Sequence, residues 1–196
     1  MDYRNEAPDI IKGFLTYHET IKGHSKKTVD EYYLDLRMFF RFMKILKGKV
    51  SEDTPFDEIP ISDVDLELVS SVSLSDVYEF LGFLSRDRAT RGNSKNTDYG
   101  LGASDRARKI ATIKSYYKYL TVKTHQIGEN PVQDLDSPKI MKSLPRYLSL
   151  EESVRLLSSI DGKNKERDFC IITLFLNCGM RISELVALNQ LVIVFV

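Results

Sequence analysis

The chain has 196 residues, with 28 Lys and Arg, 28 Asp and Glu, and a formal net charge of zero. Hydrophobic residues make up 42% of it, including 10 Tyr and 10 Phe, which suffices for a packed core and excludes a wholly disordered chain. No apolar run approaches the about 20 residues that span a bilayer, and the first residues lack an apolar signal core, so we expect a cytoplasmic protein without membrane contact.

The first third of the chain has helical periodicity. Residues 8–21 carry apolar side chains at helical spacing, and Gly23 ends that segment. Ser25 is a typical N-cap for a second helix, whose apolar face runs from Val29 to Met43. Beside this face lies a basic stripe at positions i, i+4 and i+7, made of Arg37, Arg41 and Lys44.

Two more helices complete an expected bundle over residues 1–128. Ser73 and Asp76 resemble a helix start, as Ser62 and Asp65 do before them. After a polar, glycine-containing loop over 88–103, a further helix is expected from about Ser104 to Val122. Its outward face is predicted to hold Arg108, Thr112 and Ser115. Four helices with short links fit a compact all-α bundle.

A predicted interdomain linker covers residues 129–146. It contains three prolines and little periodicity, which keeps a chain extended. A sharp helix start follows at Ser149 and Glu152, which form the capping-box pattern S-x-x-E. Residues 165–177 form a strongly apolar helix that Gly179 ends, and Arg181 begins the last helix.

The zero net charge hides segregated charge. Residues 22–49 carry eight basic and three acidic groups, whereas residues 50–80 carry nine acids and no Lys or Arg. Residues 86–123 carry ten basic groups against three acids. If the two basic segments meet in space, they form a positive face that attracts a polyanion in a salt-dependent way. Ordinary solvated helix surface is the other interpretation.

Few residues point to reaction chemistry. Cys170 and Cys178 lie eight apart, which fits neither a disulfide framework nor a metal site, so we expect structural thiols and no metal. Arg181 stands at a helix start, and Glu184 on the same face can orient its guanidinium. A held Arg suits two phosphate oxygens. A surface Arg–Glu pair is the alternative interpretation of this motif taken alone.

In order and spacing, these motifs resemble the tyrosine recombinase family of phage-integrase and Xer type. Ser25-Lys-Lys-Thr28-x3-Tyr32-x3-Leu36-x2-Phe39 is similar to the second helix of the family's N-terminal core-binding domain. The segment from Arg108 to Leu120 is similar to its fourth helix. The proline-containing segment and Leu148-Ser149-x-Glu151-Glu152 resemble the linker into the catalytic domain, and Gly179-Met180-Arg181-Ile182-Ser183-Glu184-Leu185 resembles the first catalytic-arginine box.

The resemblance implies a mainly α chain of three parts: a four-to-five-helix, SAM-like core-binding bundle over 1–128, the linker over 129–146, and the first helices of an incomplete catalytic domain over 147–196. The family clamps duplex DNA and cuts it with a tyrosine that becomes joined to the 3′ phosphate, without metal or other cofactor. It works with other recombinase protomers in a tetrameric synapse. Arg181 and Glu184 match its catalytic residues, and the predicted DNA contacts are Lys26, Lys27, Arg37, Arg41, Arg106, Arg108, Lys109 and Lys114. Lys142 and Arg146 of the linker are further candidates.

The sequence departs from the family after that box. Its His-x-x-Arg motif and nucleophilic Tyr have no counterpart, because no Tyr, Lys, His or Arg follows Glu184. We therefore expect a truncated chain that does not cleave DNA alone. The apolar tail from Asn189 to Val196 fits a frameshift, a premature stop or a strand that was cut off.

Three functions follow as hypotheses. The first is a recombinase fragment that binds duplex DNA but is inactive alone. The second is a stand-alone DNA-binding regulator or a competitor of a full-length recombinase. The third is a helical interaction module that does not bind DNA, whose acidic residues 50–80 dock a basic partner. Salt-dependent binding to duplex DNA separates the first two hypotheses from the third.

Overall fold

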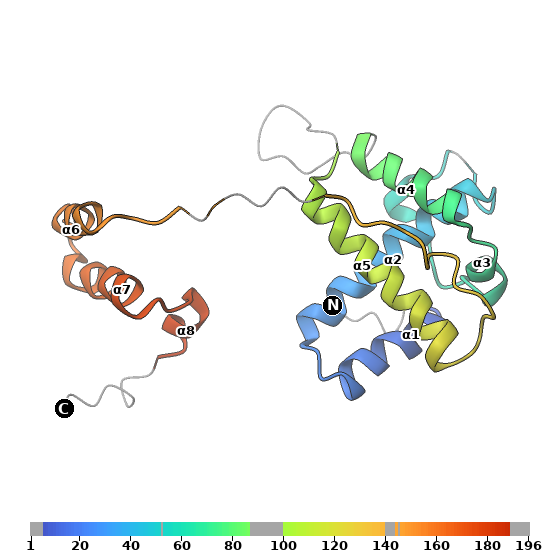
Figure 1. The fold of residues 1–196 in the computed structure, drawn as a ribbon, viewed down its shortest axis with the longest axis horizontal. Helices are drawn as coiled ribbons and strands as arrows, with labels where there is room; N and C mark the ends of the chain where they lie inside the picture. Colours follow the sequence, from blue (N-terminus) through green and yellow to red (C-terminus); the bar gives the residue numbers. More distant parts are fainter. Residues whose placement is uncertain (1–5, 52, 87–99, 140–143, 145, 189–196) are drawn as a thin grey trace. The chain divides into compact units, whose positions relative to one another are not determined.

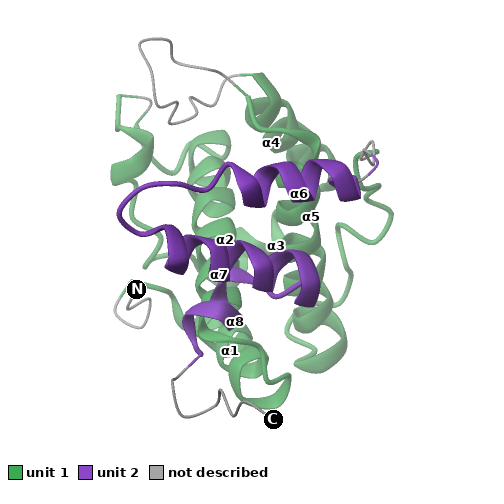
Figure 2. Cartoon of the chain, turned by 90° about the vertical axis from the view of Figure 1, so that its left-hand side faces the viewer, with its two compact units in different colours: residues 1–141 green, residues 142–196 purple. Residues whose placement is uncertain are grey.

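The computed structural model describes residues 6–51, 53–86, 100–139, 144 and 146–188. The chain divides into two compact units, residues 1–141 and 142–196 (Figure 2). Over the described residues the secondary structure is helical, with eight α-helices and no strand. This confirms the mainly α fold. Most of the predicted loop over 88–103, the apolar tail and Lys142 lie outside the described residues.

Unit 1 is a helical bundle (Figure 1). Its long helices are α2, α4 and α5, and the other elements are short. Helix α1 continues directly into a π-helical turn, η1, and α5 continues into another, η3. In chain order the elements are α1 (Asp9–Thr16), η1 (Tyr17–Ile21), α2 (Lys26–Leu46), η2 (Phe56–Glu58), α3 (Leu66–Ser70), α4 (Leu74–Arg86), α5 (Ala103–Lys118) and η3 (Tyr119–Lys123).

The helix starts follow from local hydrogen bonding. The Ser25 hydroxyl accepts a hydrogen bond from the Thr28 backbone N–H at 3.3 Å, which caps α2 as predicted. Asp65 caps α3 in the same way. Before α4, the Ser73 hydroxyl accepts from the Asp76 N–H and the Asp76 carboxylate accepts from the Ser73 N–H. These contacts satisfy N–H groups that have no partner inside the helix.

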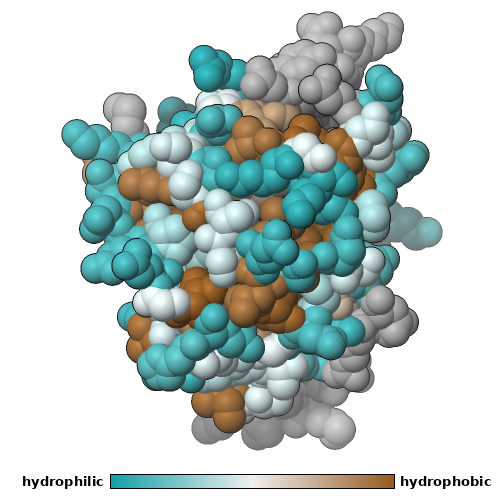
Figure 3. Space-filling view, turned by 90° about the vertical axis from the view of Figure 1, so that its right-hand side faces the viewer, coloured by the Kyte–Doolittle hydropathy of each residue, from teal (hydrophilic) through white to brown (hydrophobic). Residues whose placement is uncertain are grey.

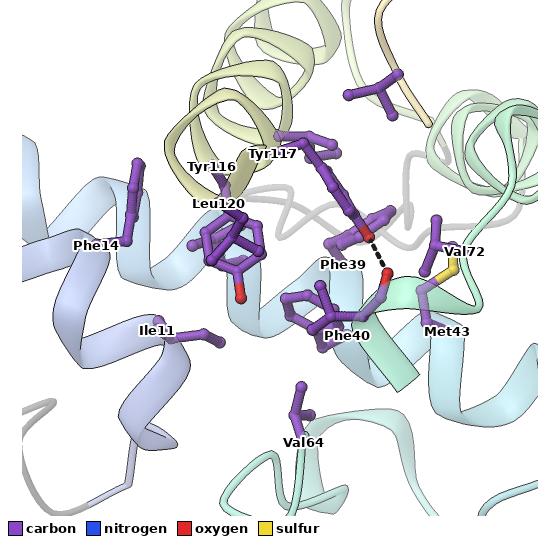
Figure 4. Packing of buried hydrophobic residues seen from close by; sticks show 14 of the residues in the cluster. Ile11, Phe14, Phe39, Phe40, Met43, Val64, Val72, Tyr116, Tyr117 and Leu120 are labelled. Atoms are coloured by element: carbon purple, nitrogen blue, oxygen red, sulfur yellow. Dashed lines mark hydrogen bonds between the residues drawn. The ribbon is translucent and has the colours of Figure 1, made fainter. Parts of the chain in front are cut away.

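The core of unit 1 lies between α2 and the helices packed against it. Large side chains from α1, α2 and α5 interdigitate there (Figure 4). Each fully buried side chain of this size contributes roughly 1.5–3 kcal/mol. Tyr117 is fully buried and its hydroxyl donates to the Val69 carbonyl at 3.0 Å, drawn as the dashed line in Figure 4. The Tyr116 hydroxyl is buried as well but has no hydrogen-bond partner among the residues that the structure describes.

The segment after η3 packs onto the bundle before the chain leaves it. Val132 and Leu135 are buried, although they fall in the stretch predicted as a linker. The Leu135 carbonyl accepts a hydrogen bond from Lys114 Nζ at 2.7 Å. The first part of the proline-containing stretch is thus attached to α5. The face of the molecule in Figure 3 intermixes hydrophilic and hydrophobic side chains, so its apolar surface is broken up by polar groups.

Unit 2 contains three helices, α6 (Leu150–Ser158), α7 (Lys165–Cys178) and α8 (Ile182–Val186). The predicted capping box at its start is confirmed, since Ser149 and Glu152 exchange both hydrogen bonds. None of the described side chains in this unit is buried. Leu150 is 82% exposed and Ile182 is 73% exposed. Among the described residues, these three helices thus have partly buried side chains, as at Ile171 and Phe175, but no fully buried core.

Candidate nucleic-acid interface

A buried carboxylate joins the two helices that carry most of the predicted DNA contacts. Asp35 on α2 is fully buried and accepts three hydrogen bonds from α5. The donors are Arg108 Nη1 at 2.8 Å, Lys109 Nζ at 2.7 Å and Thr112 Oγ1 at 2.9 Å. Figure 1 shows α5 passing across α2 in this part of the bundle. The two cations compensate the charge of a carboxylate that would be costly to bury alone.

The three donors differ in what they offer to a ligand. The Arg108 side chain is 42% exposed and also pairs with Glu31 at 3.0 Å, so its guanidinium lies at the surface. The Lys109 side chain is only 6% exposed. Thr112, which the helical pattern places on the outward face, is buried instead. This expectation was wrong because the hydroxyl is the third donor to Asp35, and a side chain that binds a buried acid must itself be buried.

The basic stripe on the second half of α2 faces the acidic segment of the same chain. Lys44 is 3% exposed and donates to both oxygens of Asp63, at 2.7 and 2.8 Å. Lys47 pairs with Asp76 at 2.7 Å. Residues 50–80 thus neutralise the C-terminal half of α2. Because counting charges by segment ignores this folding back, it overstates the positive surface.

Arg37 and Arg41 are held within the bundle. Arg41 Nε donates to the Ile59 carbonyl at 2.8 Å, and burial lowers the pKa of its guanidinium. Arg37 lies over the Tyr33 ring with its Cζ 5.4 Å from the centroid. The Tyr33 hydroxyl donates to Glu6 at 2.9 Å, and burial together with that carboxylate raises the pKa of Tyr33 to about 12.

The remaining predicted contacts divide into two kinds. Arg106 donates to the Leu101 carbonyl and Lys114 donates to the Leu135 carbonyl, so both tie α5 to neighbouring backbone. Lys26 and Lys27 lie exposed on the first turn of α2, and neither forms an ion pair with another described residue. Among the eight predicted positions, exposed charge therefore concentrates at Lys26, Lys27 and Arg108.

Sequence reasoning missed Asp35 and Asp63. For Asp35 a signal was available, because it stands directly before Leu36 and four residues before Phe39, both buried. An acid so close to an apolar stripe predicts a buried partner. For Asp63 no local signal exists, because its partner Lys44 is 19 residues away.

The arginine box in unit 2 has the local geometry that the sequence indicates. Gly179 adopts a left-handed backbone conformation with φ of 61° and ends α7. Arg181 is the N-cap of α8, and its backbone N–H donates to Glu184 at 2.7 Å. Its Nη1 donates to the other Glu184 oxygen at 3.1 Å, and the side chain is 82% exposed. The guanidinium is thus oriented by one acid and open to a ligand.

Metal sites, disulfides and membrane-spanning helices were also sought in the part of the chain that the structure describes. No group of three or more His, Cys, Asp or Glu side chains there could hold a metal ion. Cys170 and Cys178 are both free and exposed. None of the helices among those residues is long and apolar enough to cross a membrane.

Comparison with curated proteins gives extensive matches to one family. The chain is 51% identical over 93% of its length to tyrosine recombinase XerC of Caldanaerobacter subterraneus subsp. tengcongensis, of which it covers 48%. It is 32% identical over 93% of its length to XerC of Myxococcus xanthus, covering 51% of that protein. It is 27% identical over 93% of its length to XerD of Listeria monocytogenes serotype 4b, covering 52%. The chain spans about half the length of the curated relatives it matches.

No protein-family model matches the chain, and no solved structure matches it. The likeness to known proteins therefore rests on the curated relatives alone. The matches with these three relatives each extend over 93% of this chain. By sequence, the curated homologues of this chain are tyrosine recombinases named XerC and XerD, and the match spans about half of their length.

Proposed function

We propose that this chain is a DNA-binding part of a tyrosine recombinase and that it binds duplex DNA through the face where α5 crosses α2. The observation that carries the proposal is the Asp35 cluster. It fixes the two helices to each other and leaves the Arg108 guanidinium at the surface. The likeness to XerC over 93% of the chain supports the same function.

The contacts proposed for this face are mainly phosphate contacts. Lys26, Lys27 and Arg108 carry exposed positive charge, which suits backbone phosphates more than base edges. Arg108 does so while it is also paired with Asp35 and Glu31. Three such contacts predict that log K falls with log salt with a slope of about −3. Lys109 acts here as a positioning residue, because its ammonium is held by Asp35.

For unit 2 we propose that Arg181 meets a phosphate and that Glu184 positions it. The resemblance to the family assigns Arg181 to the scissile phosphate, where two donors of one guanidinium suit two oxygens. No Tyr follows Glu184 in these 196 residues. The polypeptide is therefore proposed to bind DNA without forming a 3′-phosphotyrosine bond. Other recombinase protomers are its proposed protein partners.

The test is fluorescence anisotropy with a labelled duplex. We expect the parent chain to bind, and we expect Lys26→Ala/Lys27→Ala to weaken binding at least fivefold, because each lost phosphate contact removes favourable charge interaction. Lys12→Ala removes one exposed charge from α1, where Lys12 pairs with Asp9, and serves as the matched control with unchanged affinity.

The outcomes separate the hypotheses. Equal affinity of the double variant and the control would place the DNA face elsewhere. Absence of salt-dependent binding by the folded parent chain would favour a helical interaction module. A covalent adduct with a suicide duplex would contradict the proposed inactivity. If the chain lowers recombination by a full-length recombinase in a mixed assay, it acts as a competitor.

A further inference from the structure

A pair of histidines connects η1 to the start of α2. His18 lies in η1, and His24 stands just before the N-cap Ser25. The two Nδ1 atoms are 3.2 Å apart, which is within hydrogen-bond distance. On its other side, His18 Nε2 lies 3.3 Å from the Ser115 hydroxyl of α5. The pair therefore lies between the two helices of the proposed DNA face.

The two rings have different environments. His18 is 7% exposed and packs edge-on against Phe14, with a ring-centroid distance of 4.4 Å. Burial, with the nearby His24 and Lys22, lowers the pKa of His18 to about 4. His18 therefore stays neutral at physiological pH. His24, in contrast, is only partly buried.

A proton added to His24 breaks neither the contact between the two histidines nor the contact of His18 with Ser115. A protonated His24 has a hydrogen on both ring nitrogens, and its Nδ1–H donates to Nδ1 of neutral His18. His18 then carries its own hydrogen on Nε2 and donates it to Ser115. The second N–H of His24 has no acceptor among the residues that the structure describes. It is a free, charged donor next to the first turn of α2.

We propose that His24, when protonated, is a further DNA-phosphate contact of this face, so that binding of duplex DNA is linked to uptake of one proton. This inference rests on the proposed function. His24 is separated by Ser25 alone from Lys26, which Lys27 follows, and we expect a phosphate that binds these ammonium groups to contact the His24 ring as well. A phosphate favours the charged imidazole, and the charged imidazole in turn favours binding.

Groups from η1, α1, α2 and α5 surround the pair of histidines. Lys22, which follows η1, is positively charged and contributes to the lowered pKa of His18. Aromatic rings provide no countercharge, and Ser115 is neutral. Glu19, also in η1, is engaged in an interaction of its own. The groups that face the histidines are Lys22 and Tyr17 from η1, Phe14 from α1, Tyr32 from α2 and Ser115 from α5.

The test compares affinity for a fluorescein-labelled duplex at about pH 6 and about pH 7.5, at fixed ionic strength. The parent chain is expected to bind about threefold to tenfold more tightly at the lower pH, since one linked proton changes affinity by at most tenfold per pH unit. His24→Asn is expected to bind equally at both. His125→Asn is the matched control, because His125 has φ of 52°, a conformation that Asn adopts readily. It is expected to keep the parent's pH dependence.

The results distinguish this inference from the proposed function. If the parent binds the duplex in a salt-dependent way but His24→Asn keeps the full pH dependence, the inference is overturned and the proposed function stands. If His125→Asn abolishes the pH dependence, the inference is also overturned. If the folded parent binds duplex at neither pH, the proposed function fails. A salt slope at about pH 6 that is smaller by about 1 in His24→Asn than in the parent supports the contact directly.

Discussion

Replacing Asp35 with Asn should destabilise unit 1 more than any other single isosteric change on α2. The substitution keeps the size of the side chain but removes the charge that two cations and one hydroxyl share at 2.7–2.9 Å. Lys109, only 6% exposed, is then left with a buried and uncompensated charge. Breaking a buried pair in this way costs about 3–5 kcal/mol. A domain of this kind has about 5–15 kcal/mol of stability in total.

The assay is urea unfolding followed by the near-ultraviolet circular dichroism of the buried tyrosines. Asp57→Asn is the matched control, because Asp57 is 82% exposed and lies 3.5 Å from Arg41. It should cost less than about 1 kcal/mol. Asp35→Asn/Lys109→Met should recover part of the loss, because it removes the unpaired cation together with its partner. The reasoning is refuted if Asp35→Asn is no worse than the control, or if the double variant is as unstable as the single one.

Three further predictions concern the stability of unit 1. Tyr116→Phe should leave stability unchanged or raise it by up to about 1 kcal/mol, because the lost hydroxyl is buried without a partner in the described part of the chain. Tyr117→Phe should cost about 1 kcal/mol by removing its hydrogen bond to Val69, and urea unfolding measures both variants. Gly100→Ala should cost more than about 2 kcal/mol, since the φ of Gly100 is 86° and a Cβ would collide with the backbone oxygen of Ser85. Gly162→Ala in unit 2, where φ is 98° and the space is open, should cost only about 1 kcal/mol of backbone strain, and equal costs would contradict this. Because the folded-state pKa of His18 is about 4 against an ordinary 6.5, the unfolded chain binds the extra proton, so stability should fall as pH drops from about 6.5 to about 4; thermal melting across this range should show a smaller fall in His18→Asn.

Local patterns in the sequence predicted the helices and the residues at which they start. Ser25 and the pair Ser149 and Glu152 form the caps that their spacing predicts. Gly23 and Gly179 both adopt the left-handed conformation at the ends where the helical pattern stops. These features depend on hydrogen bonds within four residues, which a sequence displays directly.

Non-local pairing could not be predicted in the same way. The sequence places Lys44 in a basic stripe beside the apolar face of the second helix. In the structure Lys44 is paired with Asp63, which lies in a segment that folds back onto α2. Thr112 was expected outward and is buried because Asp35 lies opposite it on another helix. In both cases the decisive partner is 19 or more residues away, so periodicity within one helix says nothing about it.

The candidate DNA residues illustrate the same division. The sequence identified the two helices that carry them, because basic residues and helical periodicity are local properties. It could not separate Arg108, which lies at the surface, from its neighbour Lys109, which is held in the interior. That distinction depends on which side chain reaches further past Asp35. A planar guanidinium on a long stem can bind the buried acid and still face solvent.

The salt dependence of duplex binding by the parent chain and by Arg108→Ala tests the central claim most directly. If the crossing of α2 and α5 is the DNA face, the parent affinity falls steeply with salt, and the slope of log K against log salt becomes smaller by about 1 in the variant. Circular dichroism must show that the variant remains folded, because Arg108 also binds Asp35. An unchanged slope in a folded variant, or parent binding that does not respond to salt, would contradict the account.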